Sequence, residues 1–162
     1  MADCKSDCSG WDTSTCVAKD PNDCGSMSWV DSETGYMWSN KTKMKWYGVI
    51  SYCNSLSEDG CSDWTSPTIS ELKTLIQNCP TKNDSYCTVN DSCLTTGCAT
   101  NACAIGCTES LDGKYSKLGD IEFLFSASAV VGADYSWGVN FNNASVVYES
   151  QDHSWFVRCI RK

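Results

Sequence analysis

The stretch Ser136-Trp-Gly-Val-Asn-Phe-Asn-Asn-Ala-Ser-Val-Val-Tyr148 contains two apolar, strand-like runs with a short Asn-rich loop between them. Similar runs lie on either side of it, at Phe123 to Ser126 and at Trp155 to Ile160. Aromatic and β-branched residues favour strands, and short loops of Asn, Ser, Asp and Gly favour antiparallel connections. The C-terminal part of the chain therefore predicts an antiparallel sheet.

Two helices and a hairpin are predicted before this sheet. Apolar residues recur at helical spacing over residues 46–57, and Gly60 follows as a stop signal. Thr68-Ile-Ser-Glu71 has the pattern of a capping box, and an apolar stripe continues from it to about Asn78. Nearer the N-terminus, residues 29–31 and 34–38 predict two short strands joined by a turn. The mixture of separate helices and strands predicts an α+β fold.

The cysteines indicate disulfides and an oxidising compartment. The chain has thirteen cysteines in 162 residues, but it lacks paired C-x2-C knuckles and has one histidine, so we expect no metal site. We expect an extracellular or cell-surface location, with a thermophile cytoplasm or a virion as the alternatives. Residues 1–30 contain no signal-peptide pattern, and we expect that a leader has been removed and Met1 added for expression. No apolar run is long enough to insert into a membrane.

The composition divides the chain into a Cys-rich N-terminal extension, residues 1–28, and one domain, residues 29–162. Inside the domain, residues 79–107 hold six cysteines and almost no aliphatic side chains, which predicts a cross-linked insertion without a hydrophobic core of its own. We expect these six cysteines to pair mainly among themselves, and fifteen pairings are open. Because thirteen is odd, at least one thiol stays free or pairs between chains.

Charge and motifs favour binding over catalysis. A net charge of −8 opposes binding of nucleic acid and favours a neutral or basic partner. The one basic cluster, Lys41, Lys43 and Lys45, is interpreted as a solvated loop. The chain lacks a nucleophile elbow, a phosphate loop, a zinc-protease motif and a calcium loop, so we expect neither an enzyme nor a bound cofactor.

Five segments in fixed order carry a family resemblance. They are Asp31-Ser-Glu-Thr-Gly-Tyr-Met-Trp38, Ser51-Tyr-Cys-Asn-Ser-Leu56, Gly60-Cys-Ser-Asp-Trp64 with Pro67-Thr-Ile-Ser-Glu-Leu72, Trp137-Gly-Val-Asn-Phe-Asn142 and Phe156-Val-Arg-Cys-Ile-Arg161. This order resembles the C-terminal domain of bacterial collagen-like adhesins, a branch of the C-type-lectin fold that also includes formylglycine-generating enzymes. The resemblance covers about residues 29–78 and 120–162.

The resemblance implies a C-type-lectin fold in which two helices pack on twisted antiparallel sheets and the chain ends meet. It places Cys53, on the first helix, against Cys159, on the last strand, and so implies a structural disulfide between them. It also implies that Trp64 and Pro67 form a tight turn buried against the sheet. Where this family usually has Arg and Leu, the chain has Thr65 and Ser66.

A second resemblance concerns residues 126–155, which are similar in composition to the variable region of proteins diversified by retroelements. Large amphipathic side chains mixed with small polar ones are typical of binding surfaces that adapt to many ligands. Because strand residues alternate, we expect Trp137, Val139 and Phe141 to face the core and Asn140 to point outward. The predicted ligand-binding residues are Tyr135, Ser136, Asn140, Asn142, Tyr148, Ser150, Asp152, His153 and Trp155.

Three functions follow from these patterns. The first is a receptor- or adhesin-type module that binds a protein or a glycan on another cell or molecule. The second is an enzyme of the formylglycine-generating type, which needs a reactive cysteine in an open pocket. The third is a structural domain of a surface appendage that binds nothing specific.

Overall fold

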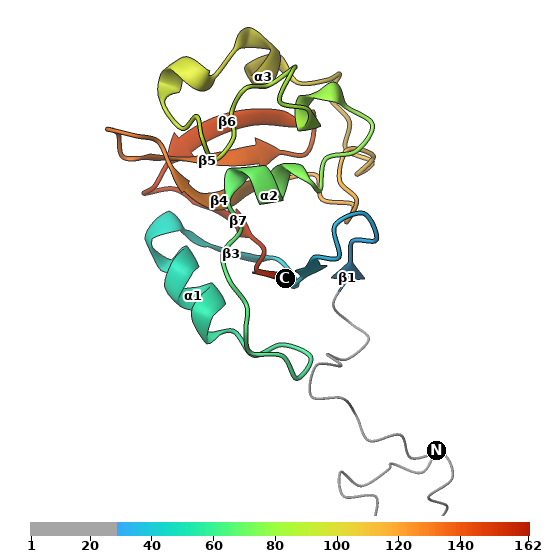
Figure 1. The fold of residues 1–162 in the computed structure, drawn as a ribbon, viewed down its shortest axis with the longest axis vertical. Helices are drawn as coiled ribbons and strands as arrows, with labels where there is room; N and C mark the ends of the chain where they lie inside the picture. The colour runs from blue at the N-terminus through green and yellow to red at the C-terminus, as the bar shows by residue number, and fades with distance from the viewer. Residues whose placement is uncertain (1–28) are drawn as a thin grey trace, which may run out of the picture.

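A computed structural model describes residues 29–162 as an α+β fold with two sheets, which confirms the predicted class (Figure 1). The expected N-terminal extension, residues 1–28, lies outside the described residues. The larger sheet has the strand order β3-β7-β4-β5-β6, and the smaller sheet has the order β1-β2-β8. The larger sheet consists of β3 (Thr42–Lys45), β4 (Phe123–Ala129), β5 (Tyr135–Asn140), β6 (Ser145–Ser150) and β7 (Ser154–Val157).

The smaller sheet joins the two ends of the described chain. It contains the expected hairpin of β1 (Trp29–Val30) and β2 (Met37–Trp38), and β2 also pairs with β8 (Ile160–Arg161). The hairpin turn is held by Asp31, whose carboxylate accepts hydrogen bonds from the Glu33 N–H and the Thr34 hydroxyl. Its buried carboxylate also lies 2.9 Å from Lys117 Nζ, so the turn is tied to a distant loop. The two ends of residues 29–162 therefore meet, as the family resemblance implies for this domain.

The larger sheet differs in two ways from the prediction. It is mixed, because β4 pairs in parallel with β7 at Leu124 and Phe156, whereas its other pairs are antiparallel. The interpretation of the lysine cluster as a loop was wrong, because β3 pairs along its whole length with β7. The side chains of β3 alternate: Lys43 and Lys45 are exposed, whereas Met44 packs against a core. This period of two is typical of a strand, but the charge of the lysines alone did not indicate one.

Two short helices flank the sheets. The first helical segment begins as the 3₁₀ turn η1 (Trp46–Gly48) and continues as α1 (Val49–Ser55), close to the predicted 46–57. The second, α2 (Ile69–Lys73), begins with the predicted capping box: Thr68 and Glu71 each accept a hydrogen bond from the other's N–H. It ends at Lys73 rather than near Asn78, because the next turn has i+3 hydrogen bonds and Ile76 then pairs with Ser116.

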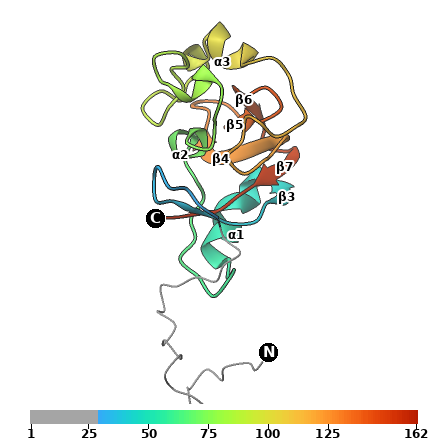
Figure 2. The same cartoon turned by 90° about the vertical axis from the view of Figure 1, so that its right-hand side faces the viewer.

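Each face of the larger sheet packs against one helix. Neighbouring β4 residues show the alternation: Leu124 joins a core with α2, whereas Phe123 and Phe125 join a core with α1. Figure 2 shows α2 beside β4 and β5, and α1 near β3. The first core includes Trp137, Val139 and Phe141, as the alternation in β5 predicts. The second includes Trp64, whose buried indole N–H donates to the Cys61 carbonyl and thereby fixes the turn before α2.

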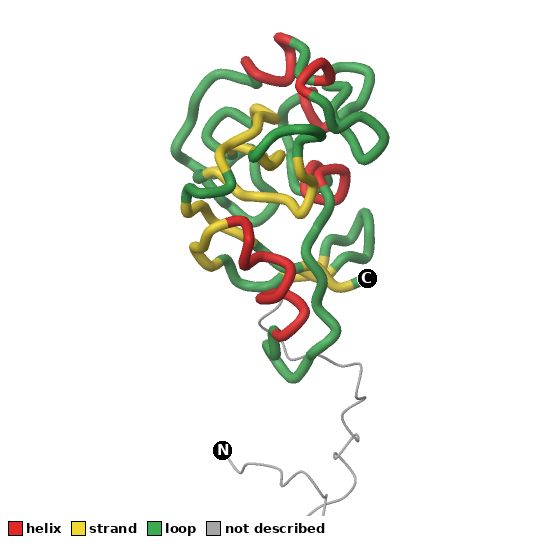
Figure 3. The backbone as a smooth tube through the Cα atoms, turned by 90° about the vertical axis from the view of Figure 1, so that its left-hand side faces the viewer, coloured by secondary structure: helices red, strands yellow, loops and turns green. Residues whose placement is uncertain are grey.

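The insertion predicted at residues 79–107 has little regular structure (Figure 3). It contains η2 (Pro80–Lys82), η3 (Thr96–Cys98) and α3 (Asn101–Ile105). Its six cysteines pair among themselves, as Cys79–Cys107, Cys87–Cys103 and Cys93–Cys98. In line with the expectation that the insertion has no hydrophobic core of its own, its buried half-cystines and Val89 pack with α2 and β5 in one cluster. The cross-links thus serve as apolar side chains.

The long-range disulfide is also confirmed. Cys53 in α1 is bonded to Cys159 just before β8, over a sequence separation of 106 residues. Both half-cystines are fully buried among the side chains of the second core. Cys61 is disulfide-bonded as well, so all nine cysteines in the described residues are cross-linked.

Candidate ligand-binding surface

Among the hollows formed by residues 29–162, two of similar size are candidates for a ligand site. One, of about 390 Å³, lies between β6 and the insertion and is lined by Thr96, Ala99, Ala104, Val146, Val147 and Tyr148. The other, of about 380 Å³, lies between the first hairpin turn, α2 and η2. Their linings differ, and this difference decides which one is the better ligand site.

The first hollow adjoins a ladder of three aromatic rings. Tyr148 of β6 makes edge-to-face contacts with Tyr135, at 5.5 Å between ring centroids, and with Trp137, at 5.2 Å. Trp137 is fully buried, whereas Tyr135 and Tyr148 are 42% and 37% exposed. The buried indole therefore holds the two phenol rings in place, and rigid aromatic side chains bind ligands with little loss of conformational entropy.

The insertion supplies the opposite wall of this hollow. The Leu94 carbonyl accepts hydrogen bonds from the Trp137 indole N–H, at 3.0 Å, and from the Val131 N–H, at 3.1 Å. The Cys93–Cys98 disulfide closes the short loop that contains Leu94. The loop is thus fixed directly above the aromatic ladder. We call Val131, Tyr135 and Tyr148, together with the lining of this hollow, the Tyr148 surface.

A glycine allows the insertion to approach β6 so closely. Gly106 follows α3 with a φ of +64°, and a Cβ at this position would lie 2.4 Å from the Asn143 carbonyl oxygen. The next residue, Cys107, donates its N–H to the same carbonyl at 2.6 Å. A side chain at position 106 would therefore push α3 away from the sheet and open the wall.

Five of the nine predicted site residues lie at or near the Tyr148 surface. Tyr135 and Tyr148 belong to it, and Ser150 is the cross-strand partner of Tyr135. Asp152 and His153 are exposed in the turn after β6, where His153 Nδ1 lies 3.7 Å from a Glu149 carboxylate oxygen. This turn follows directly from the strand that carries Tyr148, so it forms the rim of the surface.

The other predicted residues do not join them. Exposure of Ser136 was a wrong prediction: it is fully buried because the Gln151 amide donates to its hydroxyl and covers it. Asn140 lies at the opposite end of β5 from Tyr135, and Asn142 lies in the turn after it. Trp155 packs edge-on against Phe123, with ring centroids 5.5 Å apart, on the α1 side of the sheet.

Residues of the insertion were missed by sequence reasoning. Thr96, Ala99 and Ala104 line the hollow, yet they are small residues in a segment without periodicity. Long-range hydrogen bonds, such as those of Leu94 with Trp137 and of Cys107 with Asn143, tie their segment to the sheet, and no local pattern indicates such contacts. Val131 carried a signal, since it is an apolar residue next to Gly132 at a predicted turn.

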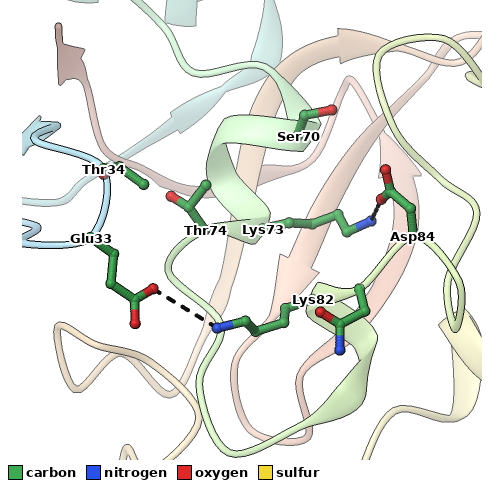
Figure 4. A pocket seen from close by; sticks show the side chains of 8 residues that line it. Glu33, Thr34, Ser70, Lys73, Thr74, Lys82 and Asp84 are labelled. Carbon is green, nitrogen blue, oxygen red and sulfur yellow. Dashed lines mark hydrogen bonds and ion pairs between the residues drawn. The ribbon is translucent and has the colours of Figure 1, made fainter.

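The second hollow is charged, but its charges already have partners (Figure 4). Buried Lys73 donates to Asp84 at 2.7 Å and to the Cys87 and Val89 carbonyls at 3.1 and 2.8 Å, which uses all three of its N–H groups. Lys82 Nζ lies 3.9 Å from a Glu33 carboxylate oxygen. A hydrogen bond from Lys117 lowers the pKa of the Glu33 carboxyl. Lys73 thus anchors the insertion to α2, and the hollow offers a ligand little unmatched charge.

The described residues contain no group of three or more His, Cys, Asp and Glu side chains that could hold a metal ion. None of the helices in residues 29–162 is both long enough and apolar enough to cross a membrane.

Comparison with known proteins places the chain in a family. The family model of the Lcl C-terminal domain matches residues 28–161, and so includes the insertion as well as the five ordered segments. A search of curated proteins finds no match. Since the family match covers well over half of the sequence, the chain belongs to the Lcl C-terminal domain family.

Proposed function

We propose that this domain is a ligand-binding module of the adhesin or receptor type and that the Tyr148 surface binds the ligand. The observation that carries the proposal is the pair of exposed tyrosines, braced by buried Trp137 and placed next to a hollow of about 390 Å³. Concave sites with rigid aromatic groups on a stable scaffold are typical of ligand binding. Membership of the family supports an adhesin-like role.

The ligand that we propose is a protein or a glycan with neutral or basic character. The net charge of −8 disfavours acidic partners, nucleic acid among them, and Asp152 with Glu149 adds negative charge at the rim of the surface. Tyrosine rings suit both classes of ligand, because they offer an apolar face and a hydroxyl.

We also propose that the domain lies outside the reducing cytoplasm and is not an enzyme. Disulfides persist in oxidising compartments, and nine cysteines in residues 29–162 are disulfide-bonded. None of these nine can act as the free thiolate that a formylglycine-generating type of enzyme needs. Titration of the whole chain with a thiol reagent tests this alternative, since an enzyme of that type requires a reactive thiol.

We also propose a C-type-lectin type of fold and diversification of the surface by a retroelement. The meeting of the chain ends in β2 and β8, and the long irregular segment between α2 and β4, support the fold. Exposure of Val131, Tyr135, Tyr148, Asp152 and His153 would permit variation at these positions without loss of core packing. A second copy of this gene segment, differing only at adenines and adjacent to a reverse transcriptase, would establish diversification, and its absence from the genome would refute it.

The binding proposal is tested with the whole chain, an array of defined glycans and a phage-displayed library of random twelve-residue peptides. We expect Tyr135→Ala and Tyr148→Ala each to weaken binding of the selected probe about tenfold or more. Tyr47→Ala is the matched control, because Tyr47 is 59% exposed but lies in η1, away from this surface. Equal effects of all three substitutions, or binding of no probe, would contradict the proposal and favour a structural appendage.

A further inference from the structure

The free edge of β6 has a defined hydrogen-bonding pattern. β6 is the last strand of the larger sheet. The Tyr135 carbonyl of β5 accepts from the Val130 N–H, and the Phe141 N–H just after β5 donates to the Glu122 carbonyl, so both residues bond toward the β4 side. Because the direction of main-chain groups alternates along an antiparallel strand, Gly138 bonds to β6, where its partner is Val147. The N–H and C=O of the next residue, Tyr148, therefore point away from the sheet.

The first part of this edge is closed by the chain itself. The Cys107 N–H donates to Asn143 and the Ser110 N–H donates to Asn142, each at 2.6 Å. The segment from Cys107 to Ser110 thus covers the turn before β6. Farther along, α3 packs against β6, and the hollow of about 390 Å³ lies between Ala104 and the stretch from Val146 to Tyr148. Within residues 29–162, no other segment forms a main-chain hydrogen bond with Tyr148 on this side.

We propose that this open edge binds an extended peptide of a partner protein, which adds to the sheet as a strand next to β6. The main chain of Tyr148 offers one donor and one acceptor to an extended backbone, which presents both groups at every second residue. The inference rests on the proposed function and names the class of ligand for the same surface.

The side walls fit alternate side chains of such a peptide. Peptide side chains on the same face of the sheet as the Tyr148 ring enter the hollow. The opposite wall of the hollow is made of Thr96, Ala99 and Ala104. These small residues leave room for an apolar side chain. Asp152 and Glu149, at the end of β6, favour a basic residue where the peptide leaves the hollow.

The test uses peptides from the random twelve-residue library that bind the whole chain. Each selected peptide is resynthesised with a single N-methyl group at every position in turn, which removes one N–H at a time. Strand addition predicts that methylation of the peptide N–H that donates to the Tyr148 carbonyl weakens binding roughly fivefold or more, whereas methylation of either neighbouring position has little effect. A flat profile, or one with a helical period, would overturn the proposal.

Amide hydrogen exchange gives a second, independent measurement. We expect the Tyr148 N–H to exchange fast in the free chain and slowly with peptide bound, whereas the Val147 N–H, which bonds to β5, is protected in both states. Unchanged exchange at Tyr148 would also overturn the proposal. Both N-methylation of the peptide and amide exchange at Tyr148 report on main-chain hydrogen bonds of the β6 edge. Neither measurement requires substitution of a side chain in the protein.

A pair of neighbouring substitutions tests the hollow. Ala104→Trp fills it and should weaken peptide binding about tenfold or more, whereas Ile105→Trp should have little effect, because Ile105 points to solvent. Equal effects of the two would refute the role of the hollow. Binding of a glycan that depends on Tyr135 and Tyr148, without any peptide that protects the Tyr148 N–H, would overturn strand addition and leave the proposed function standing.

Discussion

Removal of the Cys53–Cys159 disulfide should cost more stability than removal of any other described cross-link. The bond spans 106 residues, for which the chain-entropy model gives about 4.8 kcal/mol at 25 °C. The Cys79–Cys107 bridge shortens the effective path to about 80 residues, which lowers the figure to about 4.5 kcal/mol. We therefore expect Cys53→Ala with Cys159→Ala to lower the melting temperature by roughly 10–18 °C.

The matched control is the Cys93–Cys98 bridge. It spans 5 residues, for which the same model gives about 2 kcal/mol. Urea unfolding followed by tryptophan fluorescence measures both double variants against the parent chain. The long-range variant should lose about 2.5 kcal/mol more than the short-range one. Equal losses, or a loss of under about 1 kcal/mol for the long-range variant, would show that loop length does not set the contribution.

Three further predictions concern side chains that hold the scaffold. Lys73→Met should lower the free energy of unfolding, measured with urea, by about 2–3 kcal/mol because it leaves the buried Cys87 and Val89 carbonyls without donors. Asp84→Asn should lower it much less, and the reverse order would contradict the role of Lys73 as the anchor of the insertion. Burial raises the pKa of the Asp31 carboxyl, but hydrogen bonds, first that from Lys117, outweigh it and hold the pKa below its ordinary value. The stability that this ionised carboxyl contributes is present above about pH 4 and is lost as the pH falls through its folded-state pKa. The loss of unfolding free energy caused by Asp31→Asn should therefore shrink in acid, and a loss that stays constant with pH would contradict this contribution. Gly138→Ala should lower the melting temperature by several degrees, since its Cβ would lie 2.3 Å from a β4 carbonyl oxygen, and an unchanged value would contradict that close contact.

Local patterns predicted the parts of the fold that local physics controls. The alternation of Trp137, Val139 and Phe141 correctly predicted that all three face the core, and the Thr68-Ile-Ser-Glu71 pattern correctly predicted the capping box. Composition also gave the pairing of the six insertion cysteines among themselves, because nothing else could order that segment. Each of these features depends on residues that are close in sequence.

Features that depend on distant partners could not be predicted in this way. Lys43 and Lys45 belong to a strand because β7 pairs with it, and charge alone suggested a loop. Ser136 is buried because Gln151, fifteen residues later, folds over it. The wall of the Tyr148 surface comes from Ala99 and Ala104, whose segment is tied to the sheet by long-range hydrogen bonds such as that of Cys107 with Asn143. The candidate site was therefore half predictable: its tyrosines were found and its opposite wall was not.

The most direct test of the account is an NMR titration of the isotope-labelled chain with the glycan or peptide selected as described above. The account predicts that the largest shifts of backbone amides occur at Tyr135 and Tyr148 and at Thr96 and Ala99 across the hollow, with little change near Lys82. Large shifts around Lys82 and Glu33, with an unperturbed Tyr148, would place the ligand in the charged hollow and contradict the account.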